Sequence, residues 1–363
     1  MEKQKRILIL TSYLTGHGHA SITSAVEDAL RERNVDFKTV EAYGMCSKTW
    51  LMSAKSYGRI TRNYPKLWEF LFNFAAVFPG FVDWMTAANC KRKFLKTFKE
   101  YMPDTIVSIH PIFVGSILGI LEKNKLPCRF ITVIADLVSI SPLWTDKRAD
   151  LTICPTRESL AYALRKGISP DKLEVVNLPT RSKITKSAGT VRETGSESGG
   201  PVKLFMMSGG EGSGDMAANV RELLKVENSR ITVIAGRNAR LEKSLKDEFG
   251  ANSNVEIHGF VNNIDELLPR HDIAIVRGSP NVLMECVNLT VPVIVTDYLG
   301  GQEPGNVDFI ITRKLGLFCF DKSNLNDFVK QYLKDGRKLL KETRRNQFEY
   351  RDLDAAKKIA GLI

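Results

Sequence analysis

The stretch that decides the fold runs from residue 275 to residue 306 and reads IVRGSPNVLMECVNLTVPVIVTDYLGGQEPGN. It predicts a strand at residues 273–276, a short helix that carries Glu285, and a second strand at residues 291–296. Strand, helix and strand at this spacing form a parallel crossover unit. The polar loops at 277–280 and 300–306 each follow a strand. Both are therefore expected at the carboxyl edge of the sheet, where ligands of such sheets bind.

The same alternation of strands and helices continues outward through both halves of the chain. Short apolar runs predict strands at residues 7–10, 105–109, 130–134, 151–154, 173–176, 202–207, 231–235 and 255–258. Residues 185–201 are rich in Gly, Ser, Thr and charge, which is typical of a linker. We therefore expect an α/β protein with a first domain at 1–182, a linker at 183–201 and a second domain at 202–342. A final helix at 343–363 is expected to pack back on the first domain.

Composition narrows the class of partner. The chain has 363 residues, 43% of them hydrophobic, and a net charge of +11. Such a charge favours nucleic acid, acidic lipid or a phosphorylated substrate. No nucleic-acid-binding motif is present, so nucleic acid is not expected as a partner. The six cysteines form no Cys-x-x-Cys pair, so neither a zinc site nor a disulfide framework is expected. The charged start and the interrupted apolar stretch at 67–85 predict neither a signal peptide nor a spanning helix.

The segment at 48–102 combines aromatic and basic residues. Several aromatic side chains, Trp68 among them, precede a nonapeptide at 91–99 that has five positive charges and no acid. Helical spacing places Arg92, Lys96 and Lys99 on one face, and Phe94 and Phe98 on another. Such a helix suits an anionic membrane surface. The alternative is a solvated basic face over an ordinary core helix. The residues expected at the membrane or the lipid acceptor are His17, Trp68, Lys91, Arg92, Lys93, Lys96, Lys99 and His110.

Polar residues follow the expected strands of the first half. His17 and His19 lie in a Gly-containing turn between a strand and a helix, and His110 and Asp136 each come just after a strand. All are therefore expected at one edge of the sheet. An imidazole that titrates near neutral pH can remove a proton from a hydroxyl group. The alternative is that these residues only shape or cap their turns.

The second half begins with a strand and the Gly-rich turn 208–214, which leads into a helix. Such turns let backbone N–H groups approach a phosphate, although this spacing is neither a Walker A motif nor a full dinucleotide fingerprint.

Seven motifs in order resemble the monogalactosyldiacylglycerol synthase and processive diacylglycerol glucosyltransferase family, over nearly the whole chain. In the first half these are Gly16-His17-Gly18-His19-Ala20-Ser21, the stretch 103–111 (PDTIVSIHP) and Leu178-Pro179-Thr180-Arg181. In the second half they are 207–214 (MSGGEGSG), Gly236-Arg237-Asn238, Gly259-Phe260-Val261 and 301–306 (GQEPGN). The resemblance implies a GT-B fold, in which two Rossmann-like domains face a central cleft and the C-terminal helix crosses back to the first domain.

The resemblance also implies an activity, the transfer of a hexose from a UDP-sugar to a diacylglycerol-type hydroxyl with inversion. His19 matches the family's proposed general base, and Asp136 is a possible second catalytic residue. Glu285 matches the acid that holds the ribose, and no metal or other cofactor is expected. The residues implied in UDP-sugar binding are Gly212, Ser213, Gly214, Arg237, Phe260, Val261, Arg277, Ser279, Glu285, Gln302, Glu303 and Asn306.

A cytoplasmic enzyme on the inner face of a membrane is therefore expected. Other functions on the same fold plan remain open. They are a polyprenyl-diphosphate-linked N-acetylglucosaminyltransferase, a UDP-sugar 2-epimerase, and a non-catalytic regulator that binds nucleotide or lipid. An epimerase would not need the basic aromatic segment. The motif residues His19, Glu285, Gln302 and Glu303 argue against a regulator.

Overall fold

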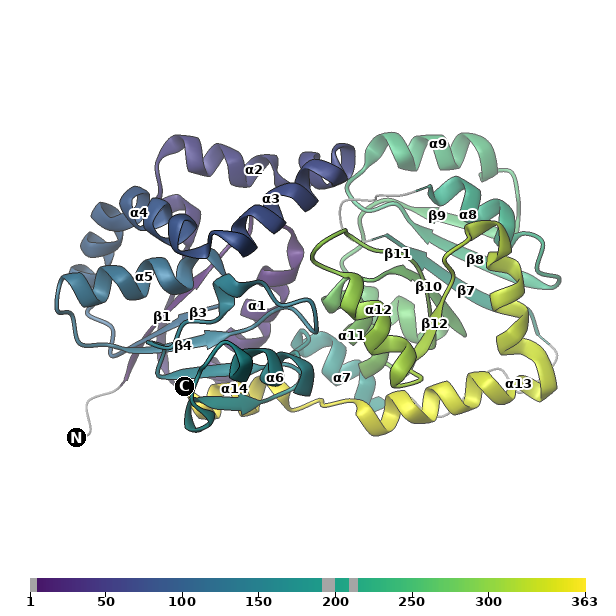
Figure 1. The fold of residues 1–363 in the computed structure, drawn as a ribbon. Coiled ribbons are helices and arrows are strands. Elements are labelled where there is room, and N and C mark those ends of the chain that lie inside the picture. The colour runs from purple at the N-terminus through teal and green to yellow at the C-terminus, as the bar shows by residue number, and fades with distance from the viewer. Residues whose placement is uncertain (1–4, 191–199, 209–214) are drawn as a thin grey trace. The chain divides into compact units, whose positions relative to one another are not determined.

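The computed structural model of the chain describes residues 5–190, 200–208 and 215–363. It divides into two compact units (Figure 1). Unit 1 comprises Met1–Arg181, Gly300–Gln302 and Asp354–Ile363, and unit 2 comprises Ser182–Leu299 and Glu303–Leu353. Each unit contains one six-stranded sheet in which every pairing is parallel. The predicted α/β class with two Rossmann-like halves is confirmed.

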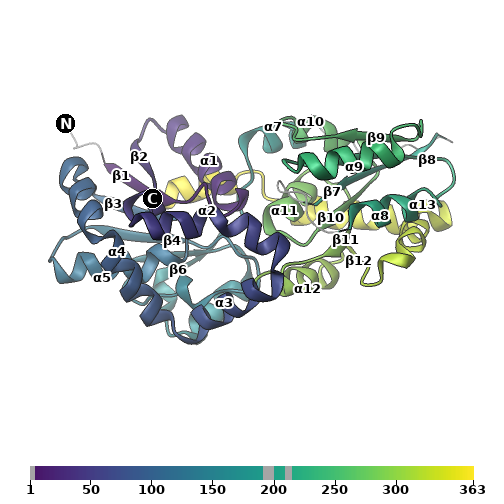
Figure 2. The ribbon, with the colours of Figure 1, turned by 90° about the horizontal axis from the view of Figure 1, so that it is seen from above.

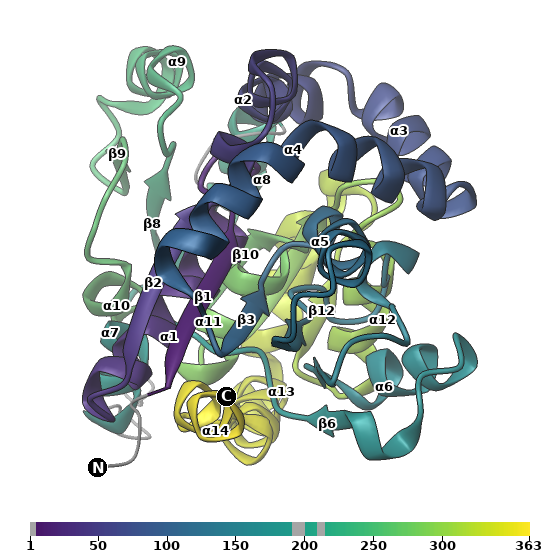
Figure 3. The ribbon, with the colours of Figure 1, turned by 90° about the vertical axis from the view of Figure 1, so that its left-hand side faces the viewer.

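Unit 1 has the strand order β2-β1-β3-β4-β5-β6. Its core strand β1 is buried on both faces because residues 7–10 are all apolar. Helices α4 and α5 lie on one side of the sheet and α1 on the other (Figure 3). The elements of unit 1 are β1 (Arg6–Thr11), α1 (His17–Glu32), β2 (Asp36–Glu41), η1 (Ala42–Met45), α2 (Lys48–Asn63), α3 (Pro65–Val77), α4 (Pro79–Tyr101), β3 (Thr105–Ser108), α5 (Ile112–Lys123), β4 (Arg129–Val133), η2 (Pro142–Trp144), β5 (Leu151–Cys154), α6 (Arg157–Arg165), η3 (Pro170–Lys172), β6 (Leu173–Val175) and α14 (Ala355–Leu362).

The last helix, α14, belongs to unit 1, where it packs on α1. Arg129 donates hydrogen bonds of 3.1 and 3.0 Å from its Nη1 to the carbonyls of Leu362 and Ile363. The chain thus returns to its first half at its end, as the predicted fold requires.

Unit 2 has the order β9-β8-β7-β10-β11-β12, which is the 3-2-1-4-5-6 arrangement of doubly wound nucleotide-binding sheets (Figure 2). The elements of unit 2 are α7 (Ser182–Thr190), β7 (Val202–Met207), α8 (Met216–Leu223), β8 (Ser229–Ile234), α9 (Ala239–Phe249), β9 (Val255–His258), α10 (Ile264–Leu267), η4 (Leu268–Arg270), β10 (Ile273–Arg277), α11 (Pro280–Asn288), β11 (Val293–Asp297), α12 (Pro304–Thr312), β12 (Gly316–Phe318), η5 (Lys322–Asn324) and α13 (Leu325–Tyr350).

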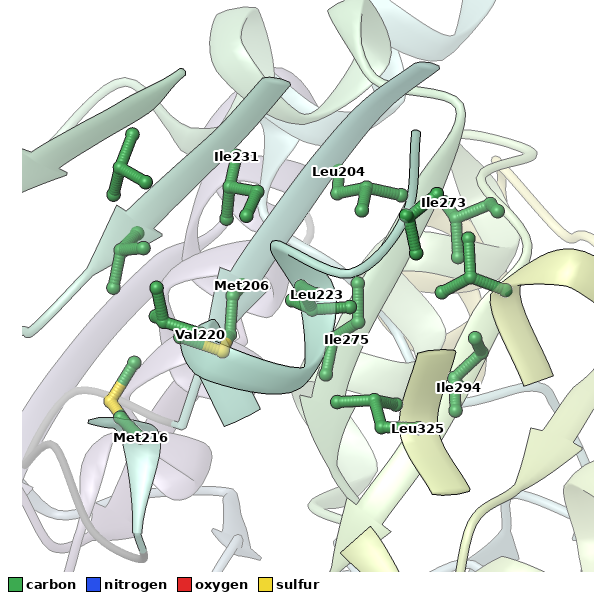
Figure 4. Close-up of a cluster of buried hydrophobic side chains, with 14 of the residues drawn as sticks. Leu204, Met206, Met216, Val220, Leu223, Ile231, Ile273, Ile275, Ile294 and Leu325 are labelled. Atoms are coloured by element: carbon green, nitrogen blue, oxygen red, sulfur yellow. The ribbon is translucent and has the colours of Figure 1, made fainter. Parts of the chain in front are cut away.

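The main core of unit 2 lies between the sheet and helices α8, α9 and α13. Strand residues such as Met206 and Ile275 meet Val220 of α8 and Leu325 of α13 there (Figure 4). All four side chains are at most 2% exposed. This packing holds β7 and β10 side by side and so fixes where the loops after these strands begin.

Proline residues mark the starts of four helices. Pro65, Pro79, Pro280 and Pro304 each occupy a first helical position, where the missing N–H is not needed. Pro304 corrects one expectation. Residues 300–306 were expected to be a loop throughout, but α12 begins inside that stretch, so Asn306 lies in its first turn.

The predicted linker at 183–201 is also wrong in part. Residues 182–190 form helix α7, in which Ile184 and Ala188 are buried at helical spacing. Two apolar residues four positions apart gave little signal among the surrounding polar ones. The expected break at 342/343 likewise falls inside α13, which belongs to unit 2 through Tyr350.

Candidate functional site

In unit 1, two histidines meet where the strand order reverses. The chain leaves β1 for α1 and β2 on one side, while β3, the other neighbour of β1, leads on to the remaining strands. Such a switch point opens a crevice at the carboxyl ends of its two strands. His19 follows β1 and His110 follows β3, and their ring centroids are 4.5 Å apart. The structure therefore brings together two predicted residues that are 91 positions apart in the sequence.

Local contacts fix this pair. Gly16 precedes α1 with a φ of 87°, in the left-handed region that favours glycine, and it turns the chain into the helix that carries His19. His110 is 3% exposed, and its Nε2 forms a 3.0 Å hydrogen bond with Thr15 Oγ1. The ring of Tyr43 contacts His110 edge-on at 5.4 Å. His17, by contrast, is exposed at the start of the helix.

Burial keeps both imidazoles neutral. It lowers the pKa of His19 to about 4, although a hydrogen bond with the backbone of Ile109 acts in the opposite direction. Burial, and then the charge of His19, lower the pKa of His110 well below its ordinary value of 6.5. Among the residues that the structure describes, none forms a hydrogen bond with His19 Nδ1. A neutral imidazole can accept a proton from a hydroxyl group that reaches one of its ring nitrogens.

Asp136 lies beside this pair through Trp144. Its Oδ2 accepts a 2.7 Å hydrogen bond from Trp144 Nε1, and both residues are buried. The Trp144 ring lies 6.1 Å from that of His19. Sequence reasoning missed Trp144 as a site residue, because it lies in a short 3-10 turn that no pattern predicted.

In unit 2, the corresponding switch point lies between β7 and β10. Arg277 ends β10, and its Nε donates a 3.0 Å hydrogen bond to Glu303 Oε2. Glu303 also accepts a 2.6 Å bond from the backbone N–H of Leu299. The side chain of Asn306 donates to the carbonyl of Gly278 at 2.9 Å. These bonds hold the turn that leads from β10 through Ser279 into α11, so Glu303 and Asn306 position Arg277.

The other predicted residues of this half do not join Arg277 and Glu303. The Arg237 guanidinium lies 4.1 Å from the ring centroid of Phe260, which is 47% exposed. Val261 is half-buried beside it. Glu285 lies within α11 and is only 5% exposed. Gln302 groups with unit 1 rather than with Glu303. The predicted phosphate-facing residues Gly212, Ser213 and Gly214 lie outside the described residues.

A small hollow at this edge adds polar residues that sequence reasoning missed. Lys322 Nζ lies 3.9 Å from Asp297 Oδ2 within it. Asp297 directly follows the strand predicted at 291–296 and ends the observed β11, so its position at the edge could have been found from the sequence. Lys322 follows β12, a three-residue strand with no clear pattern. The polar lining of this hollow consists of Ser208, Asp215, Asn219, Arg277, Thr296, Asp297 and Lys322.

The aromatic segment of unit 1 forms an exposed surface. No residue of α3 is fully buried. Phe74, Phe78, Phe81 and Trp84, called the aromatic row below, are 39–62% exposed. The ring of Phe74 contacts those of Phe78 and Phe81, and Phe81 contacts Trp84, at centroid distances of 5.1 to 6.5 Å. Contiguous exposed apolar surface of this kind marks an interaction site. Trp68, predicted for this surface, is half-buried and does not join the row.

The basic residues lie further along α4. Lys91, Arg92, Lys96 and Lys99 are exposed, whereas Phe94 and Phe98 face the core as predicted. Lys93 is exposed too, but its Nζ donates hydrogen bonds to the carbonyls of Gly44 at 3.0 Å and Cys46 at 3.1 Å. Among the described helices, none alone has the length and hydropathy to cross a membrane, while α3 and α4 together pass that test but meet at a bend of 96°.

Comparisons with known proteins match both halves. The family profile for monogalactosyldiacylglycerol (MGDG) synthase matches residues 19–180, and that for glycosyl transferases group 1 matches residues 211–334. Monogalactosyldiacylglycerol synthase of Spinacia oleracea is 28% identical over 99% of this chain and 72% of its own length. A probable monogalactosyldiacylglycerol synthase of Nicotiana tabacum is 30% identical over 91% of this chain. The chain spans 65% of that relative's length.

Solved structures share the fold at low identity. MurG of Acinetobacter baumannii superposes with a TM-score of 0.67 at 12% identity, covering 99% of both chains. MnaA of S. aureus, solved with UDP, superposes with a TM-score of 0.63 at 14% identity, covering 98% of this chain and 94% of its own. These similarities confirm the predicted GT-B fold.

Proposed function

Because the chain belongs to the monogalactosyldiacylglycerol synthase family of glycosyltransferases, we propose that it transfers a hexose from a UDP-sugar to the hydroxyl group of a diacylglycerol-type lipid. The observation that carries the proposal is the neutral His19 beside His110 at the switch point of unit 1. A lipid hydroxyl needs a base to become a nucleophile. His19 and His110 are two imidazoles that lie together at a sheet edge where ligands of such sheets bind.

The proposed reaction is a single displacement. The acceptor oxygen forms a bond to the anomeric carbon while the bond from that carbon to the phosphate oxygen breaks. UDP leaves with the electron pair, and the acceptor proton moves to His19. One displacement inverts the configuration of the sugar. Asp136 accepts a hydrogen bond from Trp144, and we propose that it helps to hold the Trp144 ring in place beside the imidazole of His19.

Unit 2 is proposed to bind the nucleotide. The Arg277 guanidinium, aimed by Glu303, would meet the negative charge that develops on the leaving UDP. Phe260, with Arg237 stacked on one face of its ring, is proposed to bind the base, and Glu285 the ribose. No metal is included in this proposal, so an excess of chelator is expected to leave the transfer rate unchanged.

Action at a membrane surface is the second part of the proposal. The aromatic row would enter the interface, while the exposed Lys91, Arg92, Lys96 and Lys99 would meet anionic head groups. We propose a peripheral protein on the cytoplasmic face. It should sediment with a membrane fraction and be released by high salt, since its attraction to head groups is screened by ions.

A panel of radiolabelled UDP-sugars tests the activity. Each sugar is incubated with the protein and with vesicles that contain either diacylglycerol or a polyprenyl-diphosphate-linked acceptor, and the lipids are separated by thin-layer chromatography. A labelled glycolipid whose linkage is inverted relative to the donor is the expected product. A product that forms only on a polyprenyl diphosphate, or conversion of a UDP-sugar without any lipid, would replace this proposal with one of the two other enzymes considered above.

A further inference from the structure

Trp68 anchors α3 on its inner side. It is half-buried and contacts the ring of Tyr57 in α2 edge-on, with centroids 4.8 Å apart and an angle of 88°. Its Nε1 is buried, and it has no hydrogen-bond partner within the part of the chain that the structure describes. The outer residues Phe70 and Val77 are 64% and 68% exposed. Helix α3 has no fully buried residue of its own, and this ring pair is one of the contacts that hold it to unit 1.

Tyr57 in turn covers the turn that delivers His19. A Cβ atom built on Gly16 would lie 3.3 Å from Tyr57 Cε1, so the ring lies directly over this glycine. Gly16 has the left-handed φ of 87° that starts α1, and His19 comes three residues later. A shift of the Tyr57 ring would therefore change the packing against Gly16 and so the conformation of this turn.

A second contact leads from α3 to the same imidazole. Helix α3 packs against η2, the 3-10 turn that ends at Trp144. Trp144 lies 6.1 Å from His19 and holds Asp136. Tyr57, which covers Gly16, and η2, which carries Trp144, therefore both contact α3, the helix that presents exposed apolar side chains.

We propose that Trp68 and Tyr57 are positioning residues. They couple the binding of α3 to an anionic lipid surface to the geometry of the turn that carries His19. The inference rests on the proposed function, because it assigns to that site a dependence on the membrane. The occupant of the outer face is a bilayer, since the exposed basic residues of α4 continue from the aromatic row and complement anionic head groups. Burial of the aromatic row in the bilayer favours the arrangement of α3 that binds the membrane over other arrangements of this helix. A surface can shift an equilibrium only when it binds one of the two states better than the other.

The test compares acceptor in two physical forms. Turnover is measured with diacylglycerol in anionic vesicles and with a short-chain diacylglycerol dissolved as monomers. The wild type is expected to have a kcat about tenfold higher or more on vesicles, because small misplacement of a catalytic group is costly. Tyr57→Leu and Trp68→Leu should lose this gain in kcat while they sediment with vesicles as the wild type does. Tyr57→Phe, which keeps the ring over Gly16, is the matched control and should retain the gain.

Two results would overturn the coupling: a wild-type kcat that is equal on both acceptors, or a vesicle gain that survives in Tyr57→Leu. A second readout does not need turnover. Amide hydrogen exchange in residues 15–20 should slow when vesicles are added to the wild type but not to Tyr57→Leu. If no sugar donor gives a product, the proposed function fails, and this exchange measurement alone then decides the coupling. If vesicles slowed amide exchange in residues 15–20 equally in the wild type and in Tyr57→Leu, the proposed coupling would be wrong.

Discussion

The candidate sites of the two units occupy the same place in related sheets but use different chemistry. In unit 1, the switch point presents His19 and His110, both neutral, packed among aromatic rings. In unit 2, the equivalent edge presents the ion pairs of Arg277 with Glu303 and of Lys322 with Asp297. The neutral site is suited to accept a proton from an uncharged hydroxyl group, and the charged site to hold an anion.

This difference shows that fold position and chemical role are separate properties. The order of strands determines where a crevice is expected, because ligands of such sheets bind where the strand order reverses. The residues just past the strand ends then determine what the crevice can bind. Variants of one edge should therefore affect one step and leave the step assigned to the other edge intact.

His19→Ala should have the largest effect. Loss of a general base typically lowers kcat by about 10²- to 10⁴-fold. UDP affinity, measured by calorimetry, should stay at the wild-type value, since UDP is assigned to unit 2. A variant that turns over normally would remove His19 as the base, and one that loses UDP binding would break the division of roles.

The pH profile of the wild type is a control on the same residue. Burial holds the pKa of His19 at about 4, so the ring of the free enzyme stays neutral across pH 5–7. The acid limb of kcat/KM should accordingly lie near pH 4 instead of near the ordinary histidine value of about 6.5. A limb at pH 6.5 would show that the titrating group is a different, more exposed one.

Glu303→Ala should have the converse effect. It leaves Arg277, whose side chain is 17% exposed, without its carboxylate, and removing one partner of a buried pair costs about 3–5 kcal/mol. Part of this cost should appear in the thermal stability and part as weaker UDP binding. The double variant Arg277→Ala/Glu303→Ala is the control. If the pair acts as a unit, the second change adds little to the first.

Much of this comparison could be predicted from the sequence. Parallel strands buried on both faces leave largely apolar runs, which is why β5 and β7 were predicted with their observed bounds. β2 was missed because the stretch Asp36 to Glu41 has only two apolar residues, Phe37 and Val40, which do not alternate at strand spacing, and none of its residues is fully buried. β12 was missed because it has only three residues. The polar residues that follow strands were found because their place depends only on chain direction.

Contacts across long sequence separations could not be predicted. The sequence places Lys93 among five equivalent charges, yet its ammonium group hydrogen-bonds carbonyls 47 and 49 positions away. Likewise, Glu303 was expected to bind the sugar, but the structure pairs it with Arg277. The hydrogen-bonding partners of a side chain follow from the packed fold, which no local pattern encodes.

Asp83→Asn tests the electrostatics of unit 1 away from its imidazoles. Burial, and then the charge of Asp146, raise the pKa of the Asp83 carboxyl from 3.8 to about 7, while Arg148 opposes the shift. Because the folded pKa lies above the unfolded one, ionisation costs stability as the pH rises from about 4 to 7. The variant should therefore be more stable than the wild type above pH 7, by a few kcal/mol, and match it near pH 4. Urea unfolding at both pH values measures this, and equal stabilities at pH 8 would contradict it.

The smallest effect should separate two lysines of one helix. Lys99→Gln removes an exposed charge of α4 and should weaken sedimentation with anionic vesicles by about 1 kcal/mol, with folding stability unchanged. Lys93→Gln removes the same charge from a side chain that bonds to Gly44 and Cys46. It should instead lower folding stability by about 1 kcal/mol. If both variants weakened vesicle binding equally without destabilising the fold, the hydrogen bonds of Lys93 would not constrain it. The basic face of α4 would then act as one uniform charge, as the sequence alone suggests.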